Sequence, residues 1–391
     1  RLPDGSWVEI VEKDERPHLL VYKDGSFRVV ESYETGGVIY KPLPRFPFLL
    51  PKAPERLEKD PTLWEDTKAF VKEHFDVPDE RAYDIIVAAI AWSYFYRAVA
   101  DKVMDASTPY LQFLGPWNSG KTRALQVIKA VAHRAVQIFN PSEAALFRMM
   151  EVFKPTLVVD EANVFNPNIL SIMAVGYRKG QYLPRADPDD PYEVHLYDVF
   201  SFIIYATREQ IREDIFSRSV TIYCERAIRE TASLIDGNRG AELRTRWFAQ
   251  YLRLRDQVSV TYTEYKSDDR LRELFSPLLV MARLFGNPDA EKNIESYGRE
   301  IEERIRGLET ASDEAAVVEA IVKLIGERPG DAPEYLLTSD IAKAMADGEG
   351  NGPDPRWVGR IMHELGFAKV KISGGKRGYK IDYNLLSRLV R

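Results

Sequence analysis

The sequence predicts an α/β protein built from several domains, and three observations lead to that prediction. The chain has 391 residues, which is more than one hydrophobic core normally organises. Between residues 108 and 227, short apolar runs alternate with helical segments, a pattern typical of a parallel sheet covered by helices on both faces. The pattern changes at both ends, where strands separated by turns precede this region and short helices followed by a hairpin end the chain.

These changes of pattern divide the sequence into five expected parts. Residues 1–50 contain short strands at 7–11, 19–22 and 26–30 and predict a small β module. A proline-rich linker and two helices, the second strongly apolar, fill residues 51–107. The α/β core follows at 108–227, and residues 228–308 are helical with charged faces. In residues 309–391, helices at 315–325, 339–345 and 355–365 and a hairpin at 368–381 predict a winged helix.

Composition excludes several classes of protein. A net charge of −6 argues against a surface coated with nucleic acid, although it leaves room for a local basic site. The single cysteine, Cys224, rules out a disulfide framework and a cysteine-rich zinc site. The most apolar run, 85–95, is too short to cross a bilayer and predicts a buried helix. No signal peptide is visible, so we expect a cytoplasmic protein, although a first residue Arg1 is typical of a fragment.

The strongest motif lies between a short apolar strand and a helix. Residues 115–122 read Gly-Pro-Trp-Asn-Ser-Gly-Lys-Thr and fit GxxxxGK[ST], a loop whose backbone N–H groups cradle phosphates at a helix N-terminus. We expect Lys121 to reach the β- and γ-phosphates of ATP and Thr122 to ligate Mg²⁺. Trp117 is unusual here, and it either covers the phosphates or packs against a neighbour. The residues expected to bind nucleotide in this segment are Gly115, Asn118, Ser119, Gly120, Lys121, Thr122 and Arg123.

Two later strand ends supply candidate catalytic groups. The apolar strand 156–159 ends in Asp160-Glu161, which places both carboxylates at the edge where ligands bind in open α/β sheets. Asp160 is expected to hold Mg²⁺, and Glu161 is expected to deprotonate the attacking water. The strand 200–206 ends at Thr207, which either contacts the γ-phosphate or caps the next helix.

A further candidate is an arginine expected to act on a neighbouring subunit. A helix predicted over 209–216 ends just before Arg218, at the edge of the domain and far from its own nucleotide. An arginine in that position suits a finger inserted into the site of an adjoining copy. The alternative is a surface arginine in a salt bridge, and Arg212 competes for the same role.

The order of these parts resembles the AAA+ class of P-loop ATPases. More narrowly, the sequence is similar to the helicase-like ATPase domain of phage, plasmid and archaeal mobile elements, which is often associated with primases. The similarity covers about residues 108–385 and leaves out the N-terminal β module. Asn163 departs from the family pattern, which usually has an aspartate there. The matching segments are 155–162, 175–180 with Arg185, 217–219 with Arg226, Arg270 ahead of 276–279, Leu337 onward, and 378–379.

The resemblance implies a fold, an assembly and partners. It implies a three-layer AAA+ domain with a helical lid at 228–308, in which Arg270 reads the nucleotide. It also implies a ring, expected to be a hexamer, that acts on single-stranded or forked DNA during replication of a mobile element. A primase or polymerase is a further expected partner, and no membrane is involved.

Two regions are candidates for contact with nucleic acid. A hairpin predicted at 180–197 has an acidic tip, so the better candidates are the basic residues at its base, Arg178, Lys179 and Arg185. The alternative is that these residues only hold the sheet together or pair with the acids of the tip. Residues 366–391 carry seven basic residues against one acid, a local basic footprint that favours phosphate contact. Within this segment we expect Lys376 and Arg377 to follow the nucleic-acid backbone. On the helix before it, at 355–365, we expect Arg356 and Arg360 to face a groove.

Three functions are consistent with the sequence. The first is an ATP- and Mg²⁺-dependent DNA helicase or translocase. The second is an initiator or loader that uses ATP to control assembly on DNA without processive unwinding. The third is an ATP-gated signalling switch that does not act on DNA.

Overall fold

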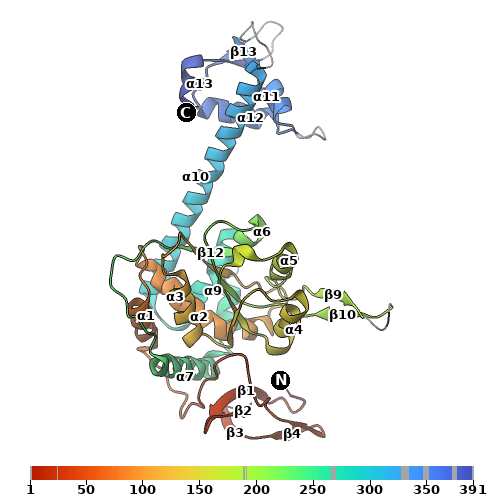
Figure 1. The fold of residues 1–391 in the computed structure, drawn as a ribbon, viewed down its shortest axis with the longest axis vertical. Helices are drawn as coiled ribbons and strands as arrows, with labels where there is room; N and C mark the ends of the chain where they lie inside the picture. Colours follow the sequence, from red (N-terminus) through yellow and green to blue (C-terminus); the bar gives the residue numbers. More distant parts are fainter. Residues whose placement is uncertain are drawn as a thin grey trace. The chain divides into compact units, whose positions relative to one another are not determined.

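The protein is described here by a computed structural model that covers residues 2–23, 25–187, 190, 192–265, 270–326, 334–346, 352–371 and 377–389. The chain forms two compact units, Arg1–Gly298 and Arg299–Arg391. Figure 1 shows the elements of both units.

The first unit begins with a small antiparallel sheet. Strands β1 (Trp7–Lys13), β2 (Arg16–Lys23) and β3 (Ser26–Val30) pair in chain order, and β4 (Tyr33–Thr35) pairs with β5 (Val38–Tyr40). The first three agree with the predicted strands, whereas β4 and β5 are too short to stand out in the sequence. The β module packs on the rest of the unit, because Trp7 lies edge-on to Tyr251 and the buried Glu9 forms an ion pair with Arg134.

The centre of the first unit is a five-stranded parallel sheet with the order β12-β6-β11-β8-β7. All four neighbouring pairs are parallel, so the carboxyl ends of all five strands lie at one edge. Strand β11 lies between the strand that leads into the glycine-rich loop, β6, and the strand that ends in Asp160-Glu161, β8. The strands are β6 (Tyr110–Leu114), β7 (Ala135–Ile138), β8 (Thr156–Val159), β11 (Ile203–Thr207) and β12 (Ser219–Tyr223).

Helices cover both faces of this sheet, as the side chains of β6 show. The Tyr110 hydroxyl donates to the Met173 carbonyl in α5 on one face, and Phe113 packs edge-on against Phe75, at the end of α1, on the other. The helix α2 is buried along almost its whole length, as its apolar sequence predicts. Among the described residues, no helix has both the length and the apolarity that a membrane span requires. The bounds are α1 (Leu63–His74), α2 (Arg81–Ala100), α3 (Lys121–Val131), α4 (Glu143–Phe153), η1 (Ala162–Val164) and α5 (Pro167–Val175).

The helical region after the sheet contains α7 (Gly237–Leu254), α8 (Val258–Tyr265) and α9 (Arg270–Leu284). These helices pack against α2, and α7 also packs against α1 and α3. The next helix, α10 (Pro288–Gly326), has 39 residues. The predicted start of a separate helix at residue 315 is therefore wrong, because residues 315–325 are the last part of α10. Gly307 is the one glycine or proline within 299–325, and it does not interrupt the helix.

Two local predictions in the core are also corrected. The helix predicted over 209–216 is reduced to α6 (Glu213–Phe216), because the Arg212 guanidinium bonds to Asp214, to the Ser171 hydroxyl and to carbonyl groups of α5, which holds the preceding segment outside the helix. The sequence after the glycine-rich loop predicts a helix over 121–135, but α3 ends at Val131, and Arg134 has a positive φ of 48°. That turn starts β7, a four-residue strand too short to give a clear pattern.

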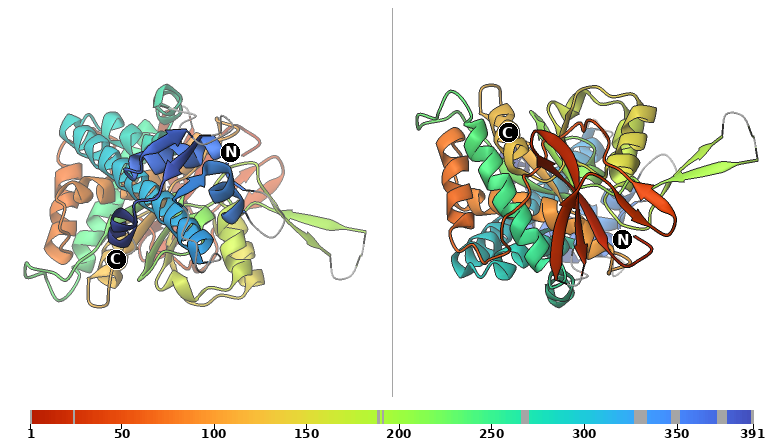
Figure 2. Two further views of the ribbon diagram at one scale, coloured as in Figure 1. Left: turned by 90° about the horizontal axis from the view of Figure 1, so that it is seen from above. Right: turned by 90° about the horizontal axis from the view of Figure 1, so that it is seen from below.

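A hairpin leaves the body of the first unit before β11. It consists of β9 (Leu183–Ala186) and β10 (Val194–Tyr197), which pair antiparallel as predicted. Figures 1 and 2 show it extending away from the sheet. The turn residues 188, 189 and 191 lie outside the described residues.

The second unit combines the end of α10 with helices and a small sheet. Strands β13 (Tyr335–Leu337), β14 (Lys369–Lys371) and β15 (Arg377–Lys380) form an antiparallel sheet with the order β13-β15-β14. The helices are α11 (Thr338–Ala344), α12 (Pro355–Glu364) and α13 (Tyr383–Leu389). Val317, Ile321, Val358, Ile361 and Met362 belong to its buried core. The predicted helices 339–345 and 355–365 and the hairpin are present, and assignment as a winged helix stays a prediction.

Candidate active site

The glycine-rich loop after β6 has the backbone geometry of an anion cradle. Asn118 and Gly120 have positive φ values of 59° and 79° on either side of Ser119, an alternation that turns successive N–H groups toward one point. Gly120 also precedes the first residue of α3, so the positive end of that helix dipole faces the same point. A Cβ at Gly120 would lie 3.2 Å from the Phe75 ring, so the loop approaches α1 as closely as glycine allows.

Gly115 serves packing between strands. A Cβ at this position would lie 2.2 Å from the carbonyl oxygen of Cys224, a distance that no side chain can occupy. Gly115 is therefore required because β12 ends beside the loop, and it contributes its carbonyl oxygen to the site. That requirement differs from the direct nucleotide contact predicted for it.

Lys121 lies inside the curve of the loop. Its ammonium donates to the carbonyl oxygens of Gly115 and Pro116, at 2.7 and 2.6 Å, and to the Ser119 hydroxyl at 3.1 Å. Burial lowers the pKa of Lys121; Cys224 acts in the opposite direction, and the Arg208 guanidinium adds to the decrease. An anion in the cradle would relieve both the desolvation and the repulsion between these two cations.

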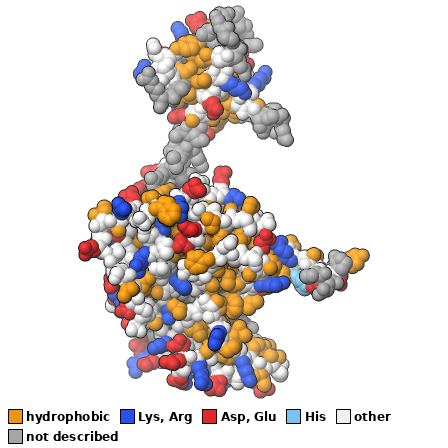
Figure 3. All heavy atoms as spheres, in the orientation of Figure 1, with side chains coloured by type: hydrophobic (Ala, Val, Ile, Leu, Met, Phe, Trp, Pro, Cys, Tyr) orange, Lys and Arg blue, Asp and Glu red, His pale blue; other side chains and the backbone are white. Residues whose placement is uncertain are grey.

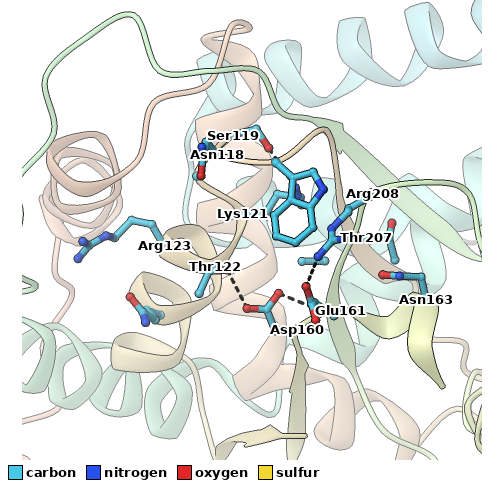
Figure 4. Close-up of a pocket in the computed structure, with 14 residues that line it drawn as sticks. Asn118, Ser119, Lys121, Thr122, Arg123, Asp160, Glu161, Asn163, Thr207 and Arg208 are labelled. Carbon is cyan, nitrogen blue, oxygen red and sulfur yellow. Dashed lines mark hydrogen bonds and ion pairs between the residues drawn. The ribbon is translucent and has the colours of Figure 1, made fainter. Parts of the chain in front are cut away.

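The two predicted halves of the site meet at the carboxyl edge of the sheet. Thr122 Oγ1 donates to Asp160 Oδ2 at 2.7 Å, and Asp160 Oδ1 accepts from the Glu161 N–H at 3.0 Å. Figure 4 shows Thr122 and Asp160 facing each other across this bond. A hydroxyl and a carboxylate oxygen are ligands that Mg²⁺ accepts, so the donor set fits the ion that the motif implies.

Glu161 is the most open of the acidic groups in the site. Its backbone has a positive φ of 53°, a strained conformation for a residue with a side chain, and its side chain is 53% exposed. The Glu161 carboxylate forms an ion pair with the Arg208 guanidinium. Arg208 in turn lies over the indole of Trp117, with 3.2 Å between its Cζ atom and the ring centroid. Trp117 therefore packs against a neighbour, which was one of its two predicted roles.

Thr207 lines the same cavity, but its hydroxyl also belongs to the interior of the sheet. Thr207 Oγ1 accepts from Gln112 Nε2 at 2.9 Å, and Gln112 Oε1 accepts from Thr221 Oγ1 at 2.9 Å. These bonds link β11, β6 and β12, and Thr207 is only 1% exposed. The contact with a phosphate predicted for Thr207 depends on its remaining O–H group.

Together these side chains surround one cavity of about 450 Å³, a size within the range of small-molecule sites. Six of the seven phosphate-loop residues predicted to bind nucleotide line it, as do Asp160, Glu161 and Thr207; Gly115 does not. Asn163, which the sequence showed only as a departure from a family pattern, also lines it, and its Oδ1 atom is buried with no hydrogen-bond partner among the described residues. The lining residues are Trp117, Asn118, Ser119, Gly120, Lys121, Thr122, Arg123, Gln126, Asp160, Glu161, Asn163, Ala206, Thr207 and Arg208.

Arg208 is the principal residue that sequence reasoning missed. It directly follows Thr207 at the end of β11, so its position at the ligand-binding edge could have been inferred. The prediction named Thr207 because a hydroxyl at a strand end can contact a phosphate. The stacking of Arg208 on Trp117 could not have been inferred, because those residues are 91 positions apart in the printed sequence.

The predicted finger lies at the other edge of the sheet. Arg218 precedes β12, and its carbonyl oxygen accepts from the Tyr110 N–H at the start of β6, so it is a strand length away from the cavity of its own chain. Its guanidinium donates to the Ala174 carbonyl at 2.7 Å and lies over the Tyr177 ring. Arg212, its competitor, is held by Asp214 and α5. Arg270 is the first residue of α9, and its side chain lies outside the described residues.

The basic residues at the base of the hairpin are paired with acids. Arg178 bonds to Glu273 at 3.0 Å, Lys179 bonds to Asp198 at 2.9 Å, and Arg185 lies 3.6 Å from Glu143. These partners lie outside the hairpin tip, so they differ from the acids that the sequence offered as the alternative partners. The outer hairpin carries exposed apolar side chains, Val194 and Leu196 at 57% and 60% and Tyr192 at 96%, and Figure 3 shows hydrophobic atoms along it.

The second unit has a cleft of about 490 Å³ on α12 and the small sheet. Two of the predicted nucleic-acid residues, Arg356 and Arg360, line it and are exposed. Arg360 lies 3.9 Å from Glu364 one turn along the helix. Lys376 lies outside the described residues, and Arg377 belongs to β15 but its side chain lies outside them too. The lining residues are Thr338, Pro355, Arg356, Gly359, Arg360, His363, Lys369 and Tyr379.

Comparisons with known proteins give structural likeness only. No protein-family model matches the sequence, and no curated protein matches it. Among solved structures, the chain is similar to one described as SCCmec type IV Cch, an active helicase, with 12% identity, a TM-score of 0.47, and coverage of 99% of this chain and 95% of that chain. It is also similar to the apo A form of the NrS-1 C-terminal region, with 15% identity, a TM-score of 0.35, and coverage of 96% of each chain. At these values the likeness carries no argument about chemistry.

Proposed function

We propose that this protein binds ATP with Mg²⁺ and hydrolyses it in the cavity at the carboxyl edge of the parallel sheet. The observation that carries the proposal is the 2.7 Å bond between Thr122 and Asp160. It joins a phosphate-binding loop to a strand end bearing two carboxylates, two features that lie 38 residues apart. A glycine turn with an incidental lysine would not need to meet an acidic strand end in this way.

Each group has a distinct task in this reaction. The loop N–H groups and Lys121 neutralise phosphate charge. Thr122 and Asp160 would hold Mg²⁺, which when bound supplies further positive charge to the phosphates. Glu161 accepts a proton from the attacking water as its oxygen bonds to the γ-phosphorus. The bond from that phosphorus to the β–γ bridging oxygen breaks, and ADP and phosphate leave.

The test of ATP hydrolysis is a steady-state phosphate-release assay. We expect turnover that requires Mg²⁺ and is lost in Lys121→Ala. Arg148→Ala, which removes an exposed arginine of α4 outside the cavity, serves as the matched control and should keep wild-type turnover. Absence of turnover in the wild-type chain at saturating ATP, with or without DNA, would contradict the proposal.

We further propose that hydrolysis drives movement on DNA, in a ring in which Arg218 acts on the adjoining subunit. The cleft beside Arg356, Arg360 and Lys369 supports a phosphate contact, because these side chains bring positive charge to one face of an otherwise acidic protein. The position of Arg218 at the sheet edge opposite its own cavity supports action in trans.

Two experiments test this second proposal. Turnover should rise with single-stranded or forked DNA, and labelled forks should be separated; binding of a single duplex sequence without strand separation would instead indicate an initiator. Mixing Arg218→Ala chains with Lys121→Ala chains should restore part of the turnover, because each supplies what the other lacks. No rescue at any ratio would count against the finger.

A further inference from the structure

The pairing of Arg208 points to a role that rests on the proposed function and goes beyond it. Arg208 connects three parts of the cavity, because it extends from the end of β11, pairs with Glu161 after β8 and stacks on Trp117 in the phosphate loop. Figure 4 shows the Arg208 side chain directed into the cavity toward Glu161. No other arginine among the described residues joins these three elements.

A purely structural role explains this arrangement poorly. The side chains of Arg208 and Glu161 are 32% and 53% exposed, and Trp117 is 69% exposed. Ion pairs and ring contacts at such exposure add little to stability. The backbone of Glu161 also has a left-handed conformation, and this conformation lowers the stability of the folded chain.

The electrostatics of the cavity favour a different partner for Arg208. Arg208 and Lys121 both line this cavity, so their positive charges repel each other. Two cations that converge on one cavity are placed to share an anion. At the same time, the guanidinium competes with water for the Glu161 oxygen that would take the proton.

We propose that Arg208 is a second cation for the terminal phosphate and that it exchanges partners when the triphosphate binds. Without nucleotide it is paired with Glu161 and stacked on Trp117. With a γ-phosphate in the cavity it bonds to a phosphate oxygen, which leaves the Glu161 carboxylate free to accept a proton from water. Because ADP lacks the γ-phosphate, it does not draw Arg208 away, and the emission of Trp117 reports which nucleotide is bound.

The kinetic test compares Arg208→Gln with Arg208→Lys and the control Arg148→Gln. Arg208→Gln should lower kcat about 100-fold, which is the usual effect of removing one hydrogen-bond donor to the negative charge that develops in the transition state. It should weaken binding of the non-hydrolysable triphosphate AMP-PNP and leave the affinity for ADP unchanged. Arg208→Lys should recover part of the loss, and Arg148→Gln should behave as wild type. An unchanged kcat in Arg208→Gln, or a raised one, would overturn the inference.

The spectroscopic test isolates the exchange of partners. Trp117 emission is obtained as the difference between the wild-type chain and Trp117→Phe, each titrated with AMP-PNP or ADP in the presence of Mg²⁺. AMP-PNP should shift the emission and ADP should not, and Arg208→Gln should abolish the difference. Equal responses to both nucleotides would refute the exchange even if the chain hydrolyses ATP. Failure of the proposed function would instead show as a wild-type chain that neither binds nor hydrolyses ATP.

Discussion

The two edges of the parallel sheet hold their charged side chains in different ways. At the amino edge, the carboxylate of Asp198 accepts from Arg97, Lys154 and Lys179 at 3.2, 3.0 and 2.9 Å. It is only 16% exposed. Burial alone would raise the pKa of Asp198, but Arg97, Lys179 and Lys154 hold it well below its usual range.

At the carboxyl edge the charges are open. Lys121 bonds to neutral oxygens, and Glu161 and Arg208 meet in a solvent-exposed pair. The comparison separates a charged cluster that maintains the fold from one that we propose binds a ligand. The first is closed around its partners and gains stability from them, whereas the second leaves its charges incompletely matched, so that a ligand can complete them. The following substitutions test that contrast.

The largest effect is expected at Glu161, where the contrast concerns catalysis. Glu161→Gln should lower kcat about 1000-fold, because the amide cannot accept the proton from water. The urea midpoint of unfolding should stay near that of wild type, since the side chain is half exposed. Phosphate release and urea titration measure the two quantities. A variant that loses both its fold and its activity would show that Glu161 maintains the fold, which would contradict the prediction.

The opposite outcome is expected at Asp198. Asp198→Asn should destabilise the first unit by about 4 kcal/mol, because three cations lose their shared buried carboxylate. Asp256→Asn is the matched control, since Asp256 pairs with Lys102 at the surface and such pairs contribute less than about 1 kcal/mol. Urea unfolding followed by fluorescence provides the comparison. Equal midpoints for the two variants would remove the distinction between the edges.

A pH dependence is expected from His133, which precedes β7 at the amino edge. Burial lowers the pKa of His133 to about 4, although Glu9 acts in the opposite direction. As the pH falls, His133 is therefore protonated in the unfolded chain before it is protonated in the folded chain. The contribution of neutral His133 to the free energy of unfolding is complete above about pH 6.5. It is lost as the pH falls toward 4, by up to about 3 kcal/mol. His133→Gln should flatten this decline in a series of unfolding curves, whereas the exposed His363→Gln should not.

The smallest effect is expected at Thr207, which lines the cavity and also bonds to Gln112 inside the sheet. Thr207→Val leaves the buried Gln112 amide without its acceptor and should cost about 2 kcal/mol of stability. Thr207→Ser keeps the hydroxyl and should restore most of it. If Thr207 also contacts the phosphate, Thr207→Val will lower kcat further than the folding loss explains. A normal kcat with reduced stability would assign Thr207 to the sheet interior alone.

Much of this site could be predicted because its signals are local in the sequence. The loop from Gly115 to Thr122 has a fixed spacing set by phosphate geometry, and Asp160-Glu161 directly follows a strand that its apolar run reveals. The hairpin and α12 were predictable for the same reason. By contrast, β4, β5 and β7 are too short to carry a period, and the start of α6 depends on bonds from Arg212 to a distant helix.

The sequence by itself determined that a phosphate loop, a carboxylate-bearing strand end and a basic C-terminal segment are present, since each depends on neighbouring residues and on chain periodicity. Only the tertiary structure decided which of their side chains meet. It joined Thr122 to Asp160, committed the Thr207 hydroxyl to Gln112, and brought Arg208 onto Trp117 beside Glu161. These contacts follow from strand order, and strand order is set by packing across the whole sheet, which no single segment encodes.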